Sequence, residues 1–509
     1  MTLRLAFVAT WALAIALAGA AQAALPDHAI VPARSAKPDL VLDGEIGPSD
    51  LSTCRALPFR VPAGVVRLSA ELTYTGHDQY TVIDMGVSDQ DGSRGWSGSN
   101  KASFTLSRTD ATPSYLPGAI RPGAWAMNLC TSAIRPGRHD RYVVGLWFWR
   151  HGDTPAVSTF SSAPIKTGAR WYRGDLHMHT AHSDGSCTPA SGQGKAPCPL
   201  YRTVDAARTR GLDFIAISDH NTGAQYNEMR ELQPAFDTLL LIPAVEVTTV
   251  HGHANMFGTT EGVDWRLSPT RTANDILADV ASLHAVISIN HPASPTDETC
   301  RGCGWDAPDT DFSKVQAIEA LNAGEILIAP KPGAPPRRSG EDFWRDLLDH
   351  GYRLTGVGGS DNHNVELGKL GVGLPTTVVY APELSERAIL AAIRAGHVFI
   401  DAAGTKDRLL ELTGEAGEAH AMMGDALTLG AGATARFKVH VAHVSGDRLV
   451  IEEDGKPLPL ADPVLQGDDA ARTFEVTGDG RAHWVRADVV SDKGPVLIGN
   501  PIYLTQGKP

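Results

Sequence analysis

The stretch "CPLYRTVDAARTRGLDFIAISDH", residues 198–220, predicts a helix followed by a strand. The helical pattern in its first half stops at Gly211, because glycine favours helix ends. Residues 213–218 form a short, largely apolar run typical of a buried strand. Asp219 and His220 come directly after this run. A helix, a buried strand and a polar pair in this order are typical of an α/β fold. In such folds the catalytic and binding residues lie at the carboxyl ends of the strands.

Six more segments of the central part repeat the strand-like pattern. Helical patterns lie between some of them, for example at residues 272–285 and 385–397. This alternation implies a parallel sheet or barrel with helices outside, and seven strands would close a small barrel. We therefore expect residues 171–404 to form an α/β domain. The six segments are the stretch at 173–185 and residues 238–247, 253–258, 285–290, 314–322 and 353–360.

The two ends of the chain have a different pattern. Residues 24–170 contain runs such as "VVRLSAELTYTG" and "RYVVGLWFWRHG", which alternate or stay apolar in the manner of strands. Residues 405–509 are similar: "ARFKVHVAHV" and "HWVRADVV" alternate, and Asp454 and Gly455 mark a turn between two short strands. We expect a β-sandwich-like domain on each side of the central domain.

The first 23 residues have the features of a signal peptide. Arg4 supplies a positive charge, an apolar stretch follows, and Ala21, Gln22 and Ala23 fit the small-x-small cleavage pattern. The alternative is a membrane anchor, since the apolar run approaches spanning length. No later segment is long and apolar enough to cross a bilayer. We expect cleavage after Ala23 and a soluble exported protein, either periplasmic or secreted.

The composition is that of an ordinary globular chain. The 509 residues are 42% hydrophobic and 20% charged, which excludes a disordered or coiled-coil chain. The formal net charge of -13 disfavours a nucleic-acid partner, because binding to phosphates needs a basic surface. The composition leaves the oligomeric state open.

The chain has six cysteines, an even number that suggests disulfides in an oxidising compartment. The central domain holds four of them, and we expect neighbours in the sequence to pair there. "CRGC", residues 300–303, has an alternative interpretation as half of a zinc site or a redox motif. The expected pairs are Cys54 with Cys130, Cys187 with Cys198, and Cys300 with Cys303.

Metal-capable side chains follow the strand-like segments one after another. His177 and His179 stand two apart, so on one strand they face the same side. Asp361 and His363 repeat this spacing after the last segment. Ligands from opposite sides of a barrel mouth can surround ions at its centre, and imidazoles with a few carboxylates suit zinc, manganese or iron. The other clusters are Asp219 with His220, Glu246, His251 with His253, and His291.

Five motifs resemble those of the PHP (polymerase and histidinol phosphatase) superfamily of metallohydrolases. They are "DLHMHTAHSDG", "GLDFIAISDHN", "PAVEVTTVHGHANMFG", "INHP" and "GGSDNH", in this order. The resemblance covers residues 172–402 and is closest to the exported carbaryl-hydrolase-like branch. It implies a distorted seven-stranded (β/α) barrel, which agrees with the strand count. It specifies the fold and the metal site more closely than the substrate.

The resemblance also implies two or three divalent ions and their ligands. His253 is preferred to His251 because "GHAN" matches the placement of the family's histidine. His182 and His251 are expected to face solvent or to support ligands. The first ion is assigned to His177, His179, Glu246 and Asp361, the second to the bridging Glu246 with His253 and His291, and the third, where present, to Asp184, His220 and His363.

Five residues next to these ligands are candidates for supporting roles. Asp175, Asp219 and Asn290 are expected to orient imidazoles through hydrogen bonds, as metal-bound histidines require. For Asp175 and Asp219 a turn or cap role is the alternative. Glu319 and Asn322, at the end of the sixth strand, either line the pocket or belong to a loop or helix start.

The implied chemistry is metal-dependent hydrolysis. Clustered ions lower the pKa of water and supply metal-activated hydroxide at neutral pH. The leading hypothesis is a phosphoesterase that acts on a small phosphoester. Asp361 is expected to accept a proton from the attacking water, and a pocket histidine, with His291 and His363 as candidates, is expected to protonate the leaving group.

Basic residues near the metal motifs are candidates for a phosphate clamp. Arg301 follows "INHP", and Lys331, Arg337 and Arg338 lie in a Pro-rich loop after the sixth strand. The alternative is that this loop is simply solvated.

Two other functions stay open. A carboxyl- or carbamate-ester hydrolase would use the same ligands, because the same hydroxide attacks either electrophile. A non-catalytic envelope binding protein would retain metal without turnover, although the full ligand set argues against it.

Overall fold

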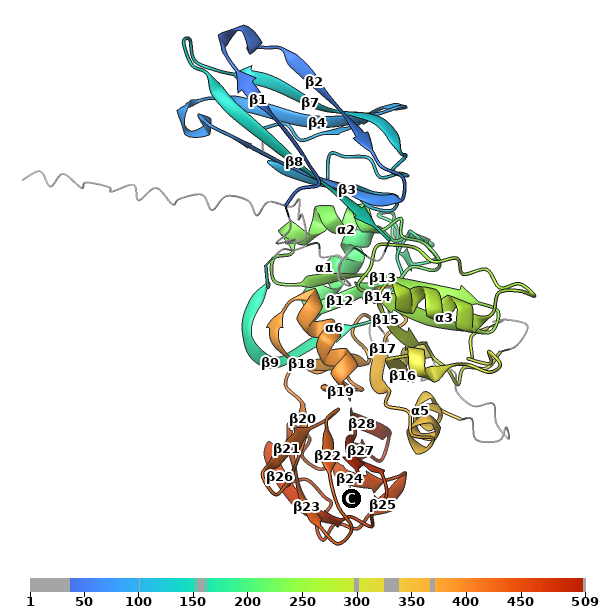
Figure 1. Cartoon of the computed structure of the whole chain (residues 1–509). Coiled ribbons are helices and arrows are strands. Elements are labelled where there is room, and N and C mark those ends of the chain that lie inside the picture. Colours follow the sequence, from blue (N-terminus) through green and yellow to red (C-terminus); the bar gives the residue numbers. More distant parts are fainter. Residues whose placement is uncertain are drawn as a thin grey trace, which may run out of the picture.

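The computed structural model describes residues 37–506 except for 100, 152, 154–159, 161–162, 297–301, 325–337 and 367–370. The expected signal peptide, Cys300, Arg301, Lys331 and Arg337 therefore lie outside the described residues. Figure 1 shows an N-terminal β unit, a central α/β unit and a C-terminal β unit that follow one another along the molecule.

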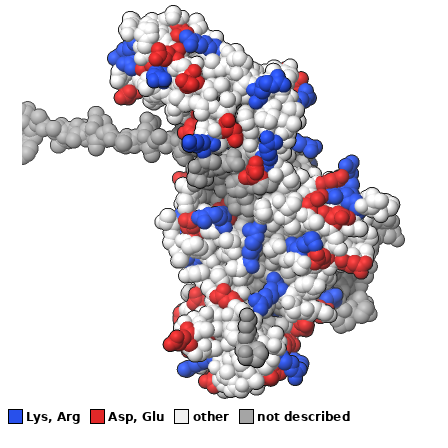
Figure 2. Space-filling view, in the orientation of Figure 1, with Lys and Arg blue, Asp and Glu red and all other residues white. Residues whose placement is uncertain are grey.

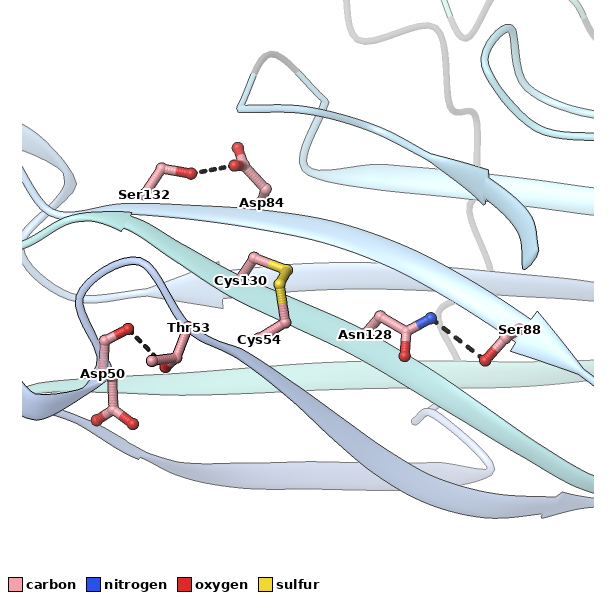
Figure 3. Close-up of a disulfide and its surroundings, with 8 residues drawn as sticks. All are labelled: Asp50, Thr53, Cys54, Asp84, Ser88, Asn128, Cys130 and Ser132. Carbon is pink, nitrogen blue, oxygen red and sulfur yellow. Dashed lines mark hydrogen bonds between the residues drawn. A yellow bond between two sulfur atoms is a disulfide. The ribbon is translucent and has the colours of Figure 1, made fainter. Parts of the chain in front are cut away.

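The N-terminal unit consists of two four-stranded antiparallel sheets. Their inner faces share one core, in which Leu68, Met85 and Val144 are fully buried. The predicted disulfide between Cys54 and Cys130 joins neighbouring strands of the second sheet (Figure 3). The first sheet has the order β1 (Leu40–Ile46), β8 (Asp140–Arg150), β3 (Val65–Tyr74) and β6 (Ser103–Ser107), and the second has β2 (Cys54–Val61), β7 (Gly123–Ala133), β4 (Val82–Asp89) and β5 (Gly92–Trp96).

The seven strand-like segments of the central part all contribute strands to one large mixed sheet. The shortest of these strands are buried along their whole length, as expected for a sheet with both faces covered. Their order is β17 (Thr355–Gly359), β16 (Ala317–Asn322), β15 (Val286–Ile289), β14 (Gly252–Phe257), β13 (Leu240–Thr249), β12 (Phe214–Ile217) and β9 (Lys166–Asp175).

Two features of this sheet differ from the expected parallel barrel. β14 is antiparallel to β13 and β15, because residues 250–251 alone connect β13 to β14 and so short a turn cannot make a parallel crossover. The barrel itself is not confirmed, since β9 pairs with β18 (Thr376–Leu384), which carries the sheet onward. An isolated bridge between Met178 and Asn362 brings the chain beyond β9 next to the chain beyond β17.

Helices accompany the central sheet, as the alternating pattern predicts. α1 ends at Gly211, whose φ of 74° lies in the left-handed region that glycine adopts without strain. α3 begins after Thr272, whose side chain accepts a hydrogen bond from the Asp275 amide. The described helices are α1 (Leu200–Arg210), α2 (Tyr226–Leu232), α3 (Ala273–Ser282), α5 (Gly340–Asp349) and α6 (Glu386–Ala395), with 3-10 turns η1 (Pro48–Asp50), η2 (His77–Gln79), η3 (Gln233–Ala235) and η4 (Phe312–Lys314) and a hairpin of β10 (Ser186–Cys187) and β11 (Ala196–Pro197).

The C-terminal unit shares the large sheet with the central unit. Phe399 of β19 (Val398–Asp401) lies opposite Gly499 of β28 in an antiparallel ladder. A second sheet, with the order β21-β20-β23-β26, packs over a core that includes the fully buried Phe437 and Val439. The expected domain limits stay predictions. The strands are β20 (Leu409–Ala416), β21 (Ala419–Met422), β22 (Ala426–Thr428), β23 (Thr434–Ala442), β24 (Arg448–Glu453), β25 (Lys456–Leu458), β26 (Asp469–Thr477), β27 (His483–Ser491), β28 (Gly494–Gly499) and β29 (Ile502–Thr505).

A buried ion cluster joins the N-terminal unit to the central unit. Asp110 is fully buried, and Arg230 of α2 donates from Nε to its Oδ2 over 2.8 Å. Arg67 of β3 pairs with the same carboxylate and also donates to Thr260 Oγ1 over 2.7 Å. Burial raises the pKa of Asp110, but the two guanidinium groups outweigh this effect and hold the pKa far below its usual range. The carboxylate is therefore ionised between two cations.

The surface and the helices add two observations. Figure 2 shows acidic and basic side chains interspersed on the visible face, so the negative net charge is not gathered in one patch there. Within the described ranges, no helix has the length and apolarity that crossing a membrane requires.

Candidate metal centre

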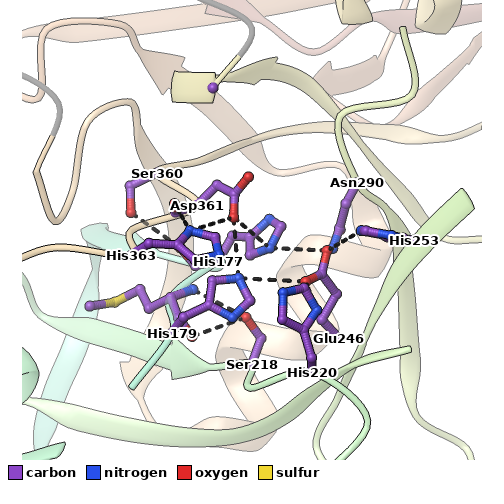
Figure 4. Close-up of polar contacts among 12 residues, drawn as sticks. His177, His179, Ser218, His220, Glu246, His253, Asn290, Ser360, Asp361 and His363 are labelled. Atoms are coloured by element: carbon purple, nitrogen blue, oxygen red, sulfur yellow. Dashed lines mark hydrogen bonds and ion pairs between the residues drawn. The ribbon is translucent and has the colours of Figure 1, made fainter. Parts of the chain in front are cut away.

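The sequence-predicted ligands come together at one edge of the large sheet (Figure 4). This convergence arises because neighbouring parallel strands end at the same edge. The ligands follow β9 (His177, His179 and Asp184), β12 (His220), β15 (His291) and β17 (Asp361 and His363), or lie within β13 (Glu246) and β14 (His253).

Glu246 is the centre of the cluster and is fully buried. His220 Nδ1 lies 2.8 Å from its Oε2, and His177 Nε2 lies 3.2 Å from its Oε1. His253 and His291 approach the same Oε1 to 3.3 Å and 3.4 Å. One carboxylate therefore faces four imidazoles at short range, and a fifth, that of His179, lies 3.5 Å from its Oε2.

The donor atoms form four overlapping groups, each compact enough to hold one metal ion, with its atoms within 4.8 Å of one another. All nine ligands implied by the resemblance belong to at least one group, although His291 groups with His177 and Asp361 rather than with His253. The groups are His179, Asp184, His220 and His363; His177, His179 and Glu246; His177, His291 and Asp361; and His220, Glu246 and His253.

Several buried atoms of these groups lack hydrogen bonds within the described part of the chain. They are both ring nitrogens of His253, Nε2 of His177 and Oε2 of Glu246. Buried polar atoms without partners are costly, so proteins rarely leave them unpaired. Divalent cations would satisfy the carboxylate oxygen and one nitrogen of each imidazole, and a donor set of imidazoles with carboxylates suits zinc, manganese or iron. The residues thus fit a metal centre.

The charges of the centre are strongly coupled. Burial lowers the pKa of His177, but Glu319, Asp361 and Glu246 outweigh it and raise the pKa well above its usual value. Burial likewise opposes ionisation of Glu246 and Asp361, and the surrounding imidazoles hold the pKa of each carboxyl well below its usual range. The carboxylates therefore draw positive charge into the site, and a metal ion can take the place of protons there.

Two of the predicted catalytic residues have a strained backbone. The φ angles of His291 and Asp361 are 28° and 51°, in the left-handed region that residues other than glycine rarely adopt. His291 is held by a bond from its Nδ1 to the Cys303 carbonyl over 2.6 Å. Asn362, next to Asp361, donates its amide to the His177 carbonyl over 3.3 Å. The surrounding contacts thus keep both side chains turned toward the cluster.

The neighbouring polar residues support the site in different ways. Asn290 donates from Nδ2 to Glu246 Oε1 over 2.9 Å and so orients a carboxylate rather than an imidazole. Asp175 accepts backbone amides, including that of Gly373 over 2.7 Å. Asp219 accepts the amide and the hydroxyl of Thr180 over 2.8 Å and 2.7 Å. Both aspartates fix loops, and within the described residues neither accepts a hydrogen bond from an imidazole, so the turn or cap alternative describes them better.

Glu319 is the supporting residue whose role the sequence left open. Its Oε1 accepts a hydrogen bond from His177 Nδ1 over 2.7 Å, and its Oε2 accepts the His291 amide over 2.8 Å. Asn322 donates from Nδ2 to the same Oε2 over 2.8 Å. A glutamate within an otherwise apolar strand is a weak signal for this role, because His177 lies far away in the sequence.

Three further candidates of the sequence also lie outside the donor groups. His182 pairs with Glu228 over 3.1 Å, and His251 pairs with Asp306 over 2.9 Å at an exposed position. Arg338 pairs with an aspartate of α5 rather than with a metal ligand. His253 belongs to a donor group and His251 does not, and the choice of His253 as the ligand stays a prediction.

The cysteines of the central unit agree only partly with the expected pairs. Cys187 and Cys198 are buried and free, although their two thiols lie close enough to interact. Cys303 is disulfide-bonded, and its expected partner Cys300 lies outside the described residues.

Comparisons with known proteins give distant similarities. No family model matches the sequence. An uncharacterised protein of Methanocaldococcus jannaschii is 25% identical over 156 residues, which are 30% of this chain and 86% of that protein.

Two solved structures are similar at low scores. A two-domain protein of Bacteroides vulgatus that contains a predicted PHP-like metal-dependent phosphoesterase has a TM-score of 0.36 and 16% identity, over 67% of this chain and 97% of that chain. A predicted metal-dependent phosphoesterase of Bifidobacterium adolescentis has a TM-score of 0.25 and 17% identity, over 37% and 87%. These scores are too low to assign an activity.

Proposed function

We propose that the chain is a metal-dependent hydrolase of the PHP type, and first of all a phosphoesterase that acts on a small phosphoester. The observation that carries this proposal is the overlap of the four donor groups, which share His177, His179, His220 and Glu246. Ions bound in groups that share ligands are neighbours, and neighbouring ions suit the hydrolysis of phosphoesters. The motif order and the seven central strands support a PHP barrel.

Residues of the chain would bind the metal ions and transfer the protons. The nine grouped residues would hold two or three ions, and such ions, when bound, ionise water at neutral pH and neutralise charge on the substrate. Asp361 is partly exposed at the mouth of the site, where its carboxylate can meet the attacking water and is the candidate for accepting its proton. His291 and His363 flank it, and either one could protonate the leaving group only while it is not bound to an ion.

The open side of the centre faces Asp184 and His363. Their side chains are 57% and 39% exposed, whereas the side chains of His177 and Glu246 are fully buried. Substrate therefore reaches the site from the group that contains Asp184, and the buried groups lie beneath it. We also propose that the protein is exported, as its N-terminal sequence suggests.

The donor set does not separate phosphoesters from carboxyl or carbamate esters, so the substrate test compares them. The full chain is purified, loaded with zinc, manganese or iron, and assayed on an aryl phosphate and an aryl carboxylate. Turnover of the phosphate supports the proposal. Turnover of the carboxylate alone would replace it with an esterase, and metal binding without turnover of either would favour a binding protein.

A further inference from the structure

Glu319 lies within β16 and is almost completely buried, yet it belongs to none of the four donor groups. Three hydrogen-bond donors converge on its carboxylate: His177 Nδ1, the His291 amide and Asn322 Nδ2. Its two oxygens therefore fix the surroundings through direct contacts.

The contact with His177 decides which ring nitrogen is free. A carboxylate only accepts hydrogen bonds, so the Nδ1 of His177 must carry a proton. In neutral imidazole this leaves a lone pair on Nε2, which lies 3.2 Å from Glu246 and 3.3 Å from Asp361. That Nε2 is buried without a hydrogen bond within the described residues. Glu319 thus turns the metal-binding nitrogen toward the other ligands.

The contact with His291 acts on the backbone. The φ of 28° at His291 is strained, and the amide of this residue donates to Glu319 Oε2. His177, His291 and Asp361 form one donor group. A single carboxylate therefore orients two of the three members of this group.

The neighbouring strand leaves room for this arrangement through a glycine. A Cβ atom at Gly359 of β17 would lie 2.0 Å from Glu319 Oε1 and 2.9 Å from the Cβ of His177. Any larger residue there would push the carboxylate and the imidazole apart. The absence of a side chain at Gly359 thus leaves the space in which Glu319 and His177 meet.

We propose that Glu319 is a positioning residue that sets the metal affinity of the centre by orienting His177 and His291, an inference that rests on the proposed metal-dependent function. The substitution Glu319→Gln tests it. The glutamine amide keeps the size but offers one acceptor and one donor, where the site presents three donors. Either His177 or His291 then loses its partner.

The control is Glu386→Gln. Glu386 of α6 is also buried, lies outside the donor groups and makes no hydrogen bond within the described part of the chain. Zinc is titrated into the metal-free full chain of each variant against a chelator of known affinity. We expect zinc to bind Glu319→Gln about 10- to 100-fold more weakly than the native chain, as for other supporting residues of metal sites. Glu386→Gln should bind as the native chain does.

Three outcomes separate the inference from the function. Unchanged zinc affinity in a folded Glu319→Gln variant would overturn the role of Glu319 and leave the proposed function intact. Failure of the native chain to bind zinc, manganese or iron would overturn both. At saturating zinc the variant should regain most of its turnover, which a purely structural defect would not allow.

If Glu319→Gln does not fold, a crystal structure of the zinc-loaded native chain decides instead. Ligation through His177 Nε2, with Nδ1 on Glu319, supports the positioning role. Ligation through Nδ1, or direct binding of Glu319 to zinc, would overturn it.

Discussion

Nδ1 of His253 lies 3.3 Å from Oε1 of Glu246, yet neither ring nitrogen of His253 makes a hydrogen bond within the described residues. The two side chains face each other without the geometry of donor and acceptor. Two ligands of one cation lie close together in this way, and both residues belong to the same donor group. The short distance between these two unbonded side chains supports a metal site at this position.

His253 and His251 offer a matched pair of substitutions. His253→Ala removes a member of a donor group, whereas His251→Ala removes an exposed side chain paired with Asp306. We expect His253→Ala to lose bound metal and at least about 10-fold in kcat/KM, since even supporting residues cost that much. His251→Ala should match the native chain. Equal metal content and turnover in the two variants would contradict the assignment.

Asp184→Asn tests the exposed donor group. Burial opposes ionisation of Asp184, but the neighbouring His363, His179 and His220 lower its pKa to about 2, so it is anionic at neutral pH. Its loss should reduce the number of ions bound per chain by one and leave the buried groups loaded. Elemental analysis after gel filtration measures this number. An unchanged ion count would show that Asp184 does not bind metal.

Metal removal should destabilise the chain, because an ion that binds only the folded state stabilises that state. At a free ion concentration 100 times the Kd, this stabilisation is about 2.7 kcal/mol. We expect a chelator to lower the Tm and added zinc or manganese to restore it. A Tm that does not respond to either treatment would argue against a metal centre.

Asp110→Asn tests how the N-terminal unit is held. The substitution leaves Arg67 and Arg230 buried without their carboxylate, which should cost about 3–5 kcal/mol at neutral pH. Urea unfolding measures the cost. Asp279→Asn, at an exposed ion pair with Arg271, is the control and should change stability by less than about 1 kcal/mol.

The pH dependence of this difference follows from the lowered pKa of Asp110. The carboxylate contributes its full stability above the pKa of the unfolded chain, about 3.9. Below that pH the unfolded chain takes up a proton and the folded one does not, so the contribution shrinks as the pH falls toward the folded pKa. The gap between the native chain and Asp110→Asn should therefore narrow below about pH 4. A gap independent of pH would show that the charge of Asp110 is not what stabilises the contact.

The sequence predicts much of the central unit because its signals are local. Apolar runs mark the seven strands, and polar residues at strand ends converge wherever neighbouring strands end at one edge. The antiparallel direction of β14 could also be predicted from the short connection before it. The two residues between β13 and β14 are too few for a parallel crossover.

Other features depend on contacts between distant segments. Glu319 meets His177 across 142 positions, and Phe399 meets Gly499 where the sheet passes into the C-terminal unit. No local pattern encodes such pairs. Cys187 and Cys198 are close in the sequence and their thiols interact, yet both are free.

Anomalous diffraction at the zinc or manganese edge, from crystals of the metal-loaded native chain, tests the metal centre most directly. The proposed centre predicts at least two neighbouring peaks, each bounded by members of the donor groups around Glu246. Peaks elsewhere, or His253, His291 and Asp361 with no metal between them, would contradict it.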